Sequence, residues 1–129
     1  KKTSLPIIAK RLVVIFQPHR FSRTKVFAKD FAKALIKADC VILAPIYSAG
    51  EEVIEGTNNK SLAKLIKNQN KSLPTFAAND FPNLIDLVKQ NTLENDLLLN
   101  MGAGDINKLW PELIKNESSK NYYALNIAA

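Results

Sequence analysis

The chain has 129 residues, 47% hydrophobic and 23% charged, a size and composition typical of one soluble globular domain. Because Cys40 is its single cysteine, the chain can form neither an intramolecular disulfide nor a structural zinc site. The apolar residues around Cys40 predict a buried, inert thiol in a reducing compartment. No apolar run approaches the roughly 20 residues that span a bilayer, and no signal-peptide pattern is recognisable. We therefore expect a cytoplasmic protein with no membrane partner.

The net charge of +6 is concentrated in the first quarter of the chain. Residues 1–30 carry eight Lys or Arg against one acid, Asp30, whereas residues 31–129 carry ten Lys against eleven acids. A nucleic-acid-binding domain usually spreads its basic residues over a face and interleaves aromatic side chains or Gly-rich turns. An excess centred on one loop and its flanks favours a small anionic ligand, so we expect no nucleic-acid partner.

The first half of the chain predicts a strand, a helix and a second strand. RLVVIF (11–16) and CVILAPIY (40–47) are continuous apolar runs rich in Val, Ile and Leu, as in parallel strands that are buried on both faces. Between them, residues 25–37 place apolar side chains on one stripe and four lysines on the opposite face, which predicts an amphipathic helix. Thr24 stands immediately before this segment, where it could cap the helix.

The second half continues the alternation with a helix, a weaker strand, a helix, a strand and a helix: SLAKLIKNQ (61–69), LPTFAA (73–78), FPNLIDLVKQ (81–90), DLLLNM (96–101) and DINKLWPELIKN (105–116). Asn79 or Asp80 is suited to cap the third helix, and Pro82 suits its first turn. Pro111 should kink the last helix or restart it after Leu109.

This order predicts an α/β protein with a Rossmann-like, mostly parallel sheet and helices on both faces. We expect a single domain over residues 1–129, with residues 1–10 and 117–129 peripheral. The tail NYYALNIAA is apolar enough to form a final strand or to pack against the body. The abrupt start without Met leads us to expect a fragment of a larger protein.

Three loops are placed where open parallel sheets bind ligands, beyond the carboxyl ends of strands and before helices. They are QPHRFSRT (17–24), PIYSAGEEVIEGTNN (45–59) and GAGD (102–105). All three should emerge at the same edge of the sheet, so their residues can converge although they are far apart in sequence. This convergence is the strongest physical indication of a functional site.

The first loop places His19, the chain's only histidine, with Arg20 and Arg23 beside a helix N-terminus. The N–H groups and dipole of such a terminus favour anions, and arginine adds bidentate recognition of carboxylate or phosphate. These residues predict an anion-binding site. The alternative is a solvated basic turn between a strand and a helix.

The second loop is long for a connection in an α/β protein. Gly50 and Gly56 supply bends, and Tyr47 and Glu51 supply polar contacts. The loop is therefore a candidate ligand-binding segment, and the alternative is a mobile surface loop.

The third loop matches half of a dinucleotide-binding fingerprint, but residue 107 is Asn where the last glycine is needed. It could equally form a tight turn in which Asp105 caps the following helix. The sequence contains no phosphate-binding G-x-x-x-x-G-K-[ST] motif, no Ser/His/Asp or Cys/His order and no metal-ligand spacing. We therefore expect neither a metal site nor a self-contained enzyme.

Three stretches resemble a known family: FQPHRFSRTKVFAKDFAKAL, ADCVILAPIYSAGEE and DLLLNMGAGDI. In this order, over about residues 11–110, they are similar to the C-terminal domain of the Mur ligases, and most similar to the members that join L-alanine to UDP-N-acetylmuramate. The QPHR-x-x-RT loop distinguishes these members from the later ligases of the pathway. One motif departs, because Pro45 stands where many members have Asp, which puts in doubt a carboxylate contact to the nucleotide ribose.

The resemblance implies a three-domain, ATP-dependent ligase of peptidoglycan synthesis, in which this domain closes on an N-terminal UDP-sugar domain and a central ATPase. ATP would phosphorylate the lactyl carboxylate of UDP-N-acetylmuramate, and the amine of L-alanine would attack the acyl phosphate. Mg²⁺ would be held mainly by the central domain. The domain alone is expected to be inactive, with neither ATP nor Mg²⁺ bound to it.

The resemblance also implies roles for single residues. His19, Arg20 and Arg23 would be catalytic, the arginines holding carboxylate or phosphate oxygens and the histidine orienting them through hydrogen bonds. The expected substrate-binding residues are Gln17, Thr24, Tyr47, Ala49, Gly50 and Glu51. The expected cleft turn is Gly102, Ala103, Gly104 and Asp105.

Two other functions remain open from the residues alone. One is a stand-alone nucleotide-binding or regulatory Rossmann-like module without ligase activity. The other is a nucleic-acid-binding domain that uses the basic first segment.

Overall fold

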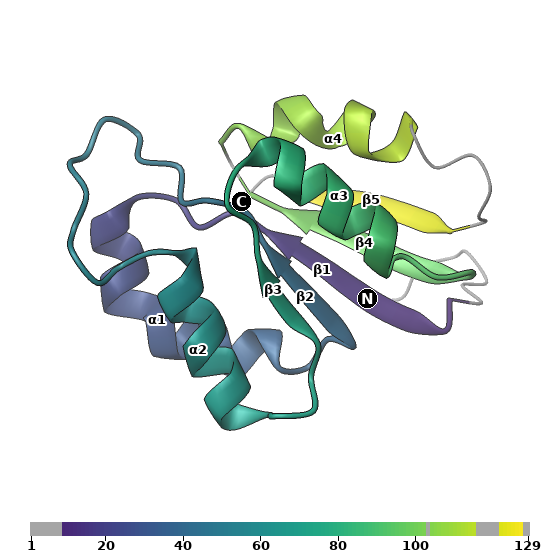
Figure 1. The fold of residues 1–129 in the computed structure, drawn as a ribbon, viewed down its shortest axis with the longest axis horizontal. Coiled ribbons are helices and arrows are strands. Elements are labelled where there is room, and N and C mark those ends of the chain that lie inside the picture. Colours follow the sequence, from purple (N-terminus) through teal and green to yellow (C-terminus); the bar gives the residue numbers. More distant parts are fainter. Residues whose placement is uncertain (1–8, 103, 116–121, 128–129) are drawn as a thin grey trace.

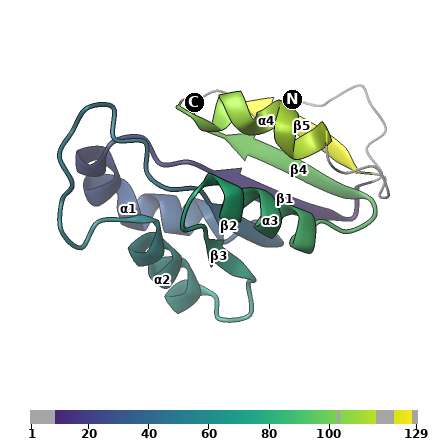
Figure 2. The ribbon, with the colours of Figure 1, turned by 45° about the horizontal axis from the view of Figure 1, so that its top comes forward.

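The computed structural model describes residues 9–102, 104–115 and 122–127. Its sheet is wholly parallel, in the order β3-β2-β1-β4-β5. The strands are β1 (Arg11–Phe16), β2 (Cys40–Leu43), β3 (Thr75–Ala77), β4 (Asp96–Met101) and β5 (Tyr123–Ile127), and the helices are α1 (Phe21–Leu35), α2 (Asn59–Gln69), α3 (Phe81–Asn91) and α4 (Ile106–Lys115). Helices α1 and α2 cover one face and α3 and α4 the other (Figures 1 and 2), which confirms the predicted Rossmann-like α/β fold.

The sheet separates two apolar layers, and the central strand β1 contributes to both. Because side chains alternate across a strand, Val13 and Ile15 join the layer beneath α3 and α4, whereas Val14 and Phe16 join the layer beneath α1 and α2. Cys40 lies in the first layer, where burial raises the pKa of its thiol to about 11. The expectation of a buried thiol is confirmed. No helix in the described ranges is long and apolar enough to cross a membrane.

Helix α1 begins at Phe21, earlier than the sequence pattern suggests, with Arg20 as its N-cap. Thr24, expected to cap the helix, instead lies buried in the first turn, and its hydroxyl donates to the Arg20 carbonyl (2.7 Å). The capping prediction is therefore wrong. The reason is tertiary, because the Arg20 N–H donates to the carbonyl of Tyr47 (2.7 Å), which ends the extended segment at Arg20.

The other helices begin and end close to their predicted positions. Asn58 and Ser61 form a capping box that starts α2 at Asn59, and the Asp80 side chain accepts from Asn83 N–H to cap α3. Helix α4 continues through Pro111 without a restart.

Strand β2 ends at Leu43 rather than at Tyr47, because the run next reaches Pro45, which has no N–H to donate to a neighbouring strand. The weaker strand is also shorter than predicted, at Thr75–Ala77. The predicted tail strand is confirmed as β5, which pairs with β4 at the edge of the sheet.

The strand order fixes where the chain reverses direction across the sheet. From β1 the chain moves outward to β2 and β3, then crosses to β4 on the other side of β1 and continues to β5. In such sheets the crevice at the reversal, beyond the carboxyl ends of the strands, is the usual ligand site. The loops after β1 and β4 flank this crevice.

An ion pair joins the amino ends of β1 and β4. The guanidinium of Arg11 donates through Nε and Nη2 to the two carboxylate oxygens of Asp96 (2.9 and 2.8 Å) and also to the carbonyl of Asn91 (2.9 Å). Asp96 is fully buried and also accepts from Leu93 N–H. The hydrogen bond to Asp96 raises the pKa of Arg11 above its ordinary value.

Candidate active site

Arg20 is held in a strained backbone conformation at the start of α1. Its φ is 72° and its ψ 141°, a combination that residues with a Cβ rarely adopt and that costs about 1–3 kcal/mol. Hydrogen bonds fix the residue on both sides: its N–H donates to the Tyr47 carbonyl, and its own carbonyl accepts from the N–H (3.1 Å) and the hydroxyl of Thr24. The strain is therefore imposed by the second loop and by the helix, at the position expected to bind an anion.

The first and second loops run side by side. Tyr47 N–H donates to the Pro18 carbonyl (2.9 Å), and with the bond from Arg20 this forms a short parallel bridge between residues 19 and 47. The rings of His19 and Tyr47 stack with their centroids 5.4 Å apart at 29°. These contacts hold the imidazole against the second loop, beside Arg20.

A carboxylate of the second loop occupies the N-terminus of α1. Glu51 accepts hydrogen bonds from the N–H of Ser22 (3.0 Å) and from its hydroxyl, and these bonds hold the pKa of Glu51 below its ordinary value. We expected the N–H groups at this helix terminus to favour an external anion. For Ser22 that expectation is wrong, because an internal carboxylate already takes its N–H group.

A tight turn brings Glu51 back to the helix. Glu51 N–H donates to the Ser48 carbonyl (3.0 Å), and the two central residues, Ala49 and Gly50, have φ values of 52° and 87°, as in a type I′ turn. Such a turn favours glycine, which explains Gly50. The second loop is therefore bonded to the first along residues 47–51 and is not simply a solvated surface loop there.

The third loop is joined to the other two by Gln17, which follows β1. Its side-chain amide donates to the Pro45 carbonyl (3.1 Å), and its amide oxygen accepts from Ile106 N–H (3.1 Å) at the start of α4. Gln17 is 2% exposed. One buried side chain thus holds all three loops at the carboxyl edge, and its proposed contact with substrate stays a prediction.

The glycines of the third loop make room for protein atoms. A Cβ on Gly104 would lie 2.5 Å from Cγ of Tyr47, and a Cβ on Gly102 would lie 2.7 Å from Cγ2 of Ile106 and 3.1 Å from Cβ of Gln17. Close packing of the chain on itself therefore accounts for both glycines.

Arg23 borders an apolar cavity of about 230 Å³ between α1 and the ends of β1 and β4. Its guanidinium lies over the ring of Phe27, 5.7 Å from the centroid. Gln17 and His19 border the same cavity, so three polar side chains of the first loop line a largely apolar hollow. The cavity is lined by Phe16, Gln17, His19, Arg23, Phe31, Ala34, Leu35, Met101 and Gly102.

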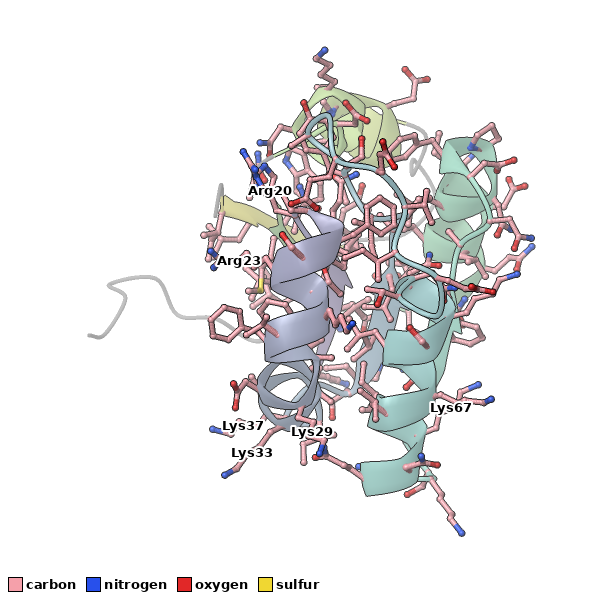
Figure 3. All side chains as sticks on the ribbon, turned by 90° about the vertical axis from the view of Figure 1, so that its left-hand side faces the viewer. Arg20, Arg23, Lys29, Lys33, Lys37 and Lys67 are labelled. Carbon is pink, nitrogen blue, oxygen red and sulfur yellow. The ribbon has the colours of Figure 1, made fainter. Side chains whose placement is uncertain are left out.

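The two arginines of the first loop have no carboxylate partner in the part of the chain that the structure describes, where the ion pair is that of Arg11 with Asp96. Both side chains are exposed. Figure 3 shows Arg20 and Arg23 at the N-terminal end of α1, whereas the labelled lysines lie further along this helix, in the turn after it and on α2. The guanidinium groups are therefore available to an anion at this edge of the sheet.

The structure brings the first two loops and the third together, as the sequence predicts. Asp105 lies in the turn before α4, half-buried, and its carbonyl accepts from Lys108 N–H (2.9 Å). Ala103 lies outside the described residues. Sequence reasoning did not identify Ser22 as a partner of Glu51, or Asn59, whose side chain donates to the carbonyls of Leu43 and Ala78 at the ends of β2 and β3.

No group of three or more His, Cys, Asp or Glu side chains is placed to hold a metal ion within the described ranges. The residues at the carboxyl edge are instead arginine, histidine, tyrosine and backbone N–H groups. Their chemistry suits the binding of carboxylate or phosphate oxygens.

Comparison with known proteins identifies close relatives, although no family model matches the chain. A UDP-N-acetylmuramate–L-alanine ligase of Prochlorococcus marinus strain NATL1A is 51% identical over 119 residues, or 89% of this chain. The ligases of the same name from strain MIT 9313 and from Synechococcus sp. strain RCC307 are 49% and 45% identical over 92% and 99% of the chain.

The chain spans about a quarter of the length of these relatives, 24% of the two from Prochlorococcus and 26% of the one from Synechococcus. The quarter that it matches contains the three loops of the carboxyl edge. Identity of this extent over nearly all of its residues shows that the chain is homologous to one quarter of the UDP-N-acetylmuramate–L-alanine ligases, the Mur ligases whose C-terminal domain its motifs resemble.

Proposed function

We propose that the chain is the C-terminal domain of an ATP-dependent ligase that joins L-alanine to UDP-N-acetylmuramate in peptidoglycan synthesis. The observation that carries the proposal is the convergence of three loops at the carboxyl edge of the sheet, with two arginines that have no carboxylate partner among the described residues. The names of the relatives support the choice of substrates.

In the proposed reaction the terminal phosphoryl group of ATP is transferred to the lactyl carboxylate of UDP-N-acetylmuramate, which yields an acyl phosphate and ADP. The L-alanine amine then attacks the acyl carbon, loses a proton and expels phosphate. The lactyl carboxylate, the acyl phosphate and the departing phosphate all carry negative charge on oxygen, whereas the attacking amine is neutral. Arg20 and Arg23 would hold carboxylate or phosphate oxygens in place, and His19, stacked on Tyr47, would orient the reacting groups through hydrogen bonds.

The remaining three quarters of the enzyme would supply the ATP phosphate site and Mg²⁺. The chain itself has no phosphate-binding glycine-lysine motif. Its arginine loop would therefore complete a site whose other wall lies on the rest of the polypeptide, and closure of the two parts would assemble it. On this proposal the chain has no ligase activity alone.

The geometry gives no support to a stand-alone dinucleotide-binding module. Such modules use glycines so that a pyrophosphate can approach the backbone. Here the space beside Gly104 is filled by the Tyr47 ring and the space beside Gly102 by Ile106 and Gln17.

A chimera tests the proposal directly. The corresponding quarter of the Prochlorococcus marinus NATL1A ligase is replaced by this chain, and phosphate release is measured with ATP and UDP-N-acetylmuramate, with and without L-alanine. We expect release that depends on L-alanine and exceeds that with glycine or L-serine. The same ligase without its matching quarter serves as the negative control. A folded chimera that releases no phosphate on addition of L-alanine would rule out the proposed function.

A further inference from the structure

We propose that Glu51 is a positioning residue that acts through Ser22 to hold the first turn of α1, and with it Arg20 and Arg23, in the geometry that binds the substrate's anionic group. The nature of that anionic group rests on the proposed function. The clamp between Glu51 and Ser22 does not, because it lies wholly within this chain.

The clamp replaces a helix cap that the local sequence does not provide. The N-cap of α1 is Arg20, whose side chain makes no capping hydrogen bond, and no acidic residue stands in the first turn. Ser22 is the second helical residue, and its N–H is one that a capping side chain ordinarily takes. Glu51 takes it instead, from a residue 29 positions further along the chain. A negative charge is favourable there because the helix dipole is positive at this end.

The clamp joins other hydrogen bonds between the second loop and the first, among them the bond from the Gln17 side chain to the Pro45 carbonyl. Two more run from Tyr47 N–H to the Pro18 carbonyl and from Arg20 N–H to the Tyr47 carbonyl. Both of these bonds hold the chain no further than Arg20. Glu51, which follows the turn at Ala49 and Gly50, accepts from Ser22, so residues 47–51 are bonded to the chain on both sides of Phe21.

The placement of Ser22 explains why the effect should reach both arginines. Ser22 lies between Arg20 and Arg23 in the sequence, within one turn of helix. Arg20 contributes to lowering the pKa of Glu51, yet the two side chains do not form an ion pair. Glu51 therefore fixes the backbone that carries the guanidinium groups without neutralising either of them by direct contact.

The first test detects the clamp in the 129-residue chain by NMR. The groups that face Glu51 are Ser22, the Phe21 backbone and Arg20. The Ser22 amide signal should move as pH falls through the pKa of Glu51, which lies below its ordinary value. Glu51→Gln should abolish this movement, and Glu52→Gln, which removes the same charge from the next, exposed residue, should leave it intact. A Ser22 amide that does not follow Glu51 would overturn the clamp.

The second test measures catalysis by the full-length ligase or the chimera. Glu51→Gln should lower kcat/KM for UDP-N-acetylmuramate about tenfold, because the arginines are less well placed, while Glu52→Gln leaves it unchanged. Ser22→Ala should have a smaller effect, and the double variant Glu51→Gln/Ser22→Ala should lose no more than Glu51→Gln alone, since both changes break one clamp. A purely structural role would lower thermal stability at unchanged kcat/KM and would overturn the inference.

The two proposals fail in different ways. If the proposed function is wrong, the unsubstituted enzyme shows no release of phosphate on addition of L-alanine, while the Ser22 amide still follows Glu51. If the positioning role is wrong, the unsubstituted enzyme is active and Glu51→Gln has the same kcat/KM.

Discussion

Strands β1 and β4 lie side by side, and arginine residues stand at both ends of the pair. At the amino end, Arg11 makes a bidentate ion pair with the buried Asp96 and donates to a backbone carbonyl. At the carboxyl end, Arg20 and Arg23 are exposed and have no carboxylate partner among the described residues. The protein thus satisfies one arginine internally and leaves two others open at the edge where ligands of such sheets bind.

The difference teaches that charge alone does not identify a site. Arg11 belongs to the same basic segment of sequence as the other two arginines, yet its role is to neutralise a buried carboxylate. The carboxyl end has its own internal carboxylate, Glu51, but this one is bonded to Ser22 rather than to an arginine. At the amino end, Asp96 takes the guanidinium group of Arg11. At the carboxyl end, Glu51 holds the backbone and side chain of Ser22 and leaves the guanidinium groups of Arg20 and Arg23 available.

The largest expected effect comes from breaking the ion pair at the amino ends of β1 and β4. Arg11→Ala leaves the buried Asp96 without its partner, and the free energy of unfolding should fall by about 3 kcal/mol, measured by urea denaturation. Lys10→Ala, an exposed neighbour, is the control. The kcat/KM of the folded full-length ligase should not change with Arg11→Ala. An equal stability of the Arg11 and Lys10 variants would contradict the role given to this ion pair.

A smaller effect is expected from adding a side chain at Gly104, where the third loop packs against Tyr47 at the carboxyl edge. Gly104→Ala should displace the Tyr47 ring and cost about 1–3 kcal/mol of stability, as overpacking usually does. Because Tyr47 also bonds to Arg20 and stacks on His19, kcat/KM should fall as well. Gly56→Ala is the comparison, since its φ of 83° adds backbone strain but no atom lies within 4 Å of the new Cβ. It should lower stability with little effect on kcat/KM, and equal kinetic losses would contradict the account.

The smallest effect is expected from the lysines further along α1. Replacing Lys29 and Lys33 with Gln relieves repulsion between two exposed like charges one turn apart, so the free energy of unfolding should change by less than about 0.5 kcal/mol. Duplex DNA titrated at low salt should show no specific binding to either form by fluorescence anisotropy. Tight binding that weakens steeply with salt, and is lost in the variant, would instead favour a nucleic-acid-binding role.

Much of the fold could be predicted because its signals are local or periodic. The apolar runs of β1, β2 and β4 are continuous because these strands are covered on both faces, and the alternation with helices requires a parallel sheet. The Asp80 cap is readable because the capping residue and its partner are neighbours in sequence. Convergence of the three loops followed from the same rule of topology.

The details of the site could not be predicted because they depend on contacts across the fold. The sequence pattern predicts a start of α1 at residue 25, but the helix begins at Phe21, because Arg20 takes its conformation from a bond to Tyr47 in another loop. The partnership of Glu51 with Ser22 has no sequence motif, and the expected open helix terminus proved to be capped from a distance. Gly104 matched a nucleotide fingerprint in sequence, whereas in three dimensions it accommodates the Tyr47 ring.

The most direct test of the open carboxyl edge compares two pairs of substitutions that each remove two positive charges, one pair at the start of α1 and the other further along the helix. In the full-length ligase, Arg20→Ala/Arg23→Ala should lower kcat/KM for L-alanine-dependent phosphate release at least 10²-fold, or about 2.7 kcal/mol of transition-state stabilisation. Lys29→Ala/Lys33→Ala should change it by less than about twofold, as expected for exposed charges outside the site. Equal losses in the two enzymes, or an unchanged rate in the arginine variant, would contradict the assignment of this edge as part of the active site.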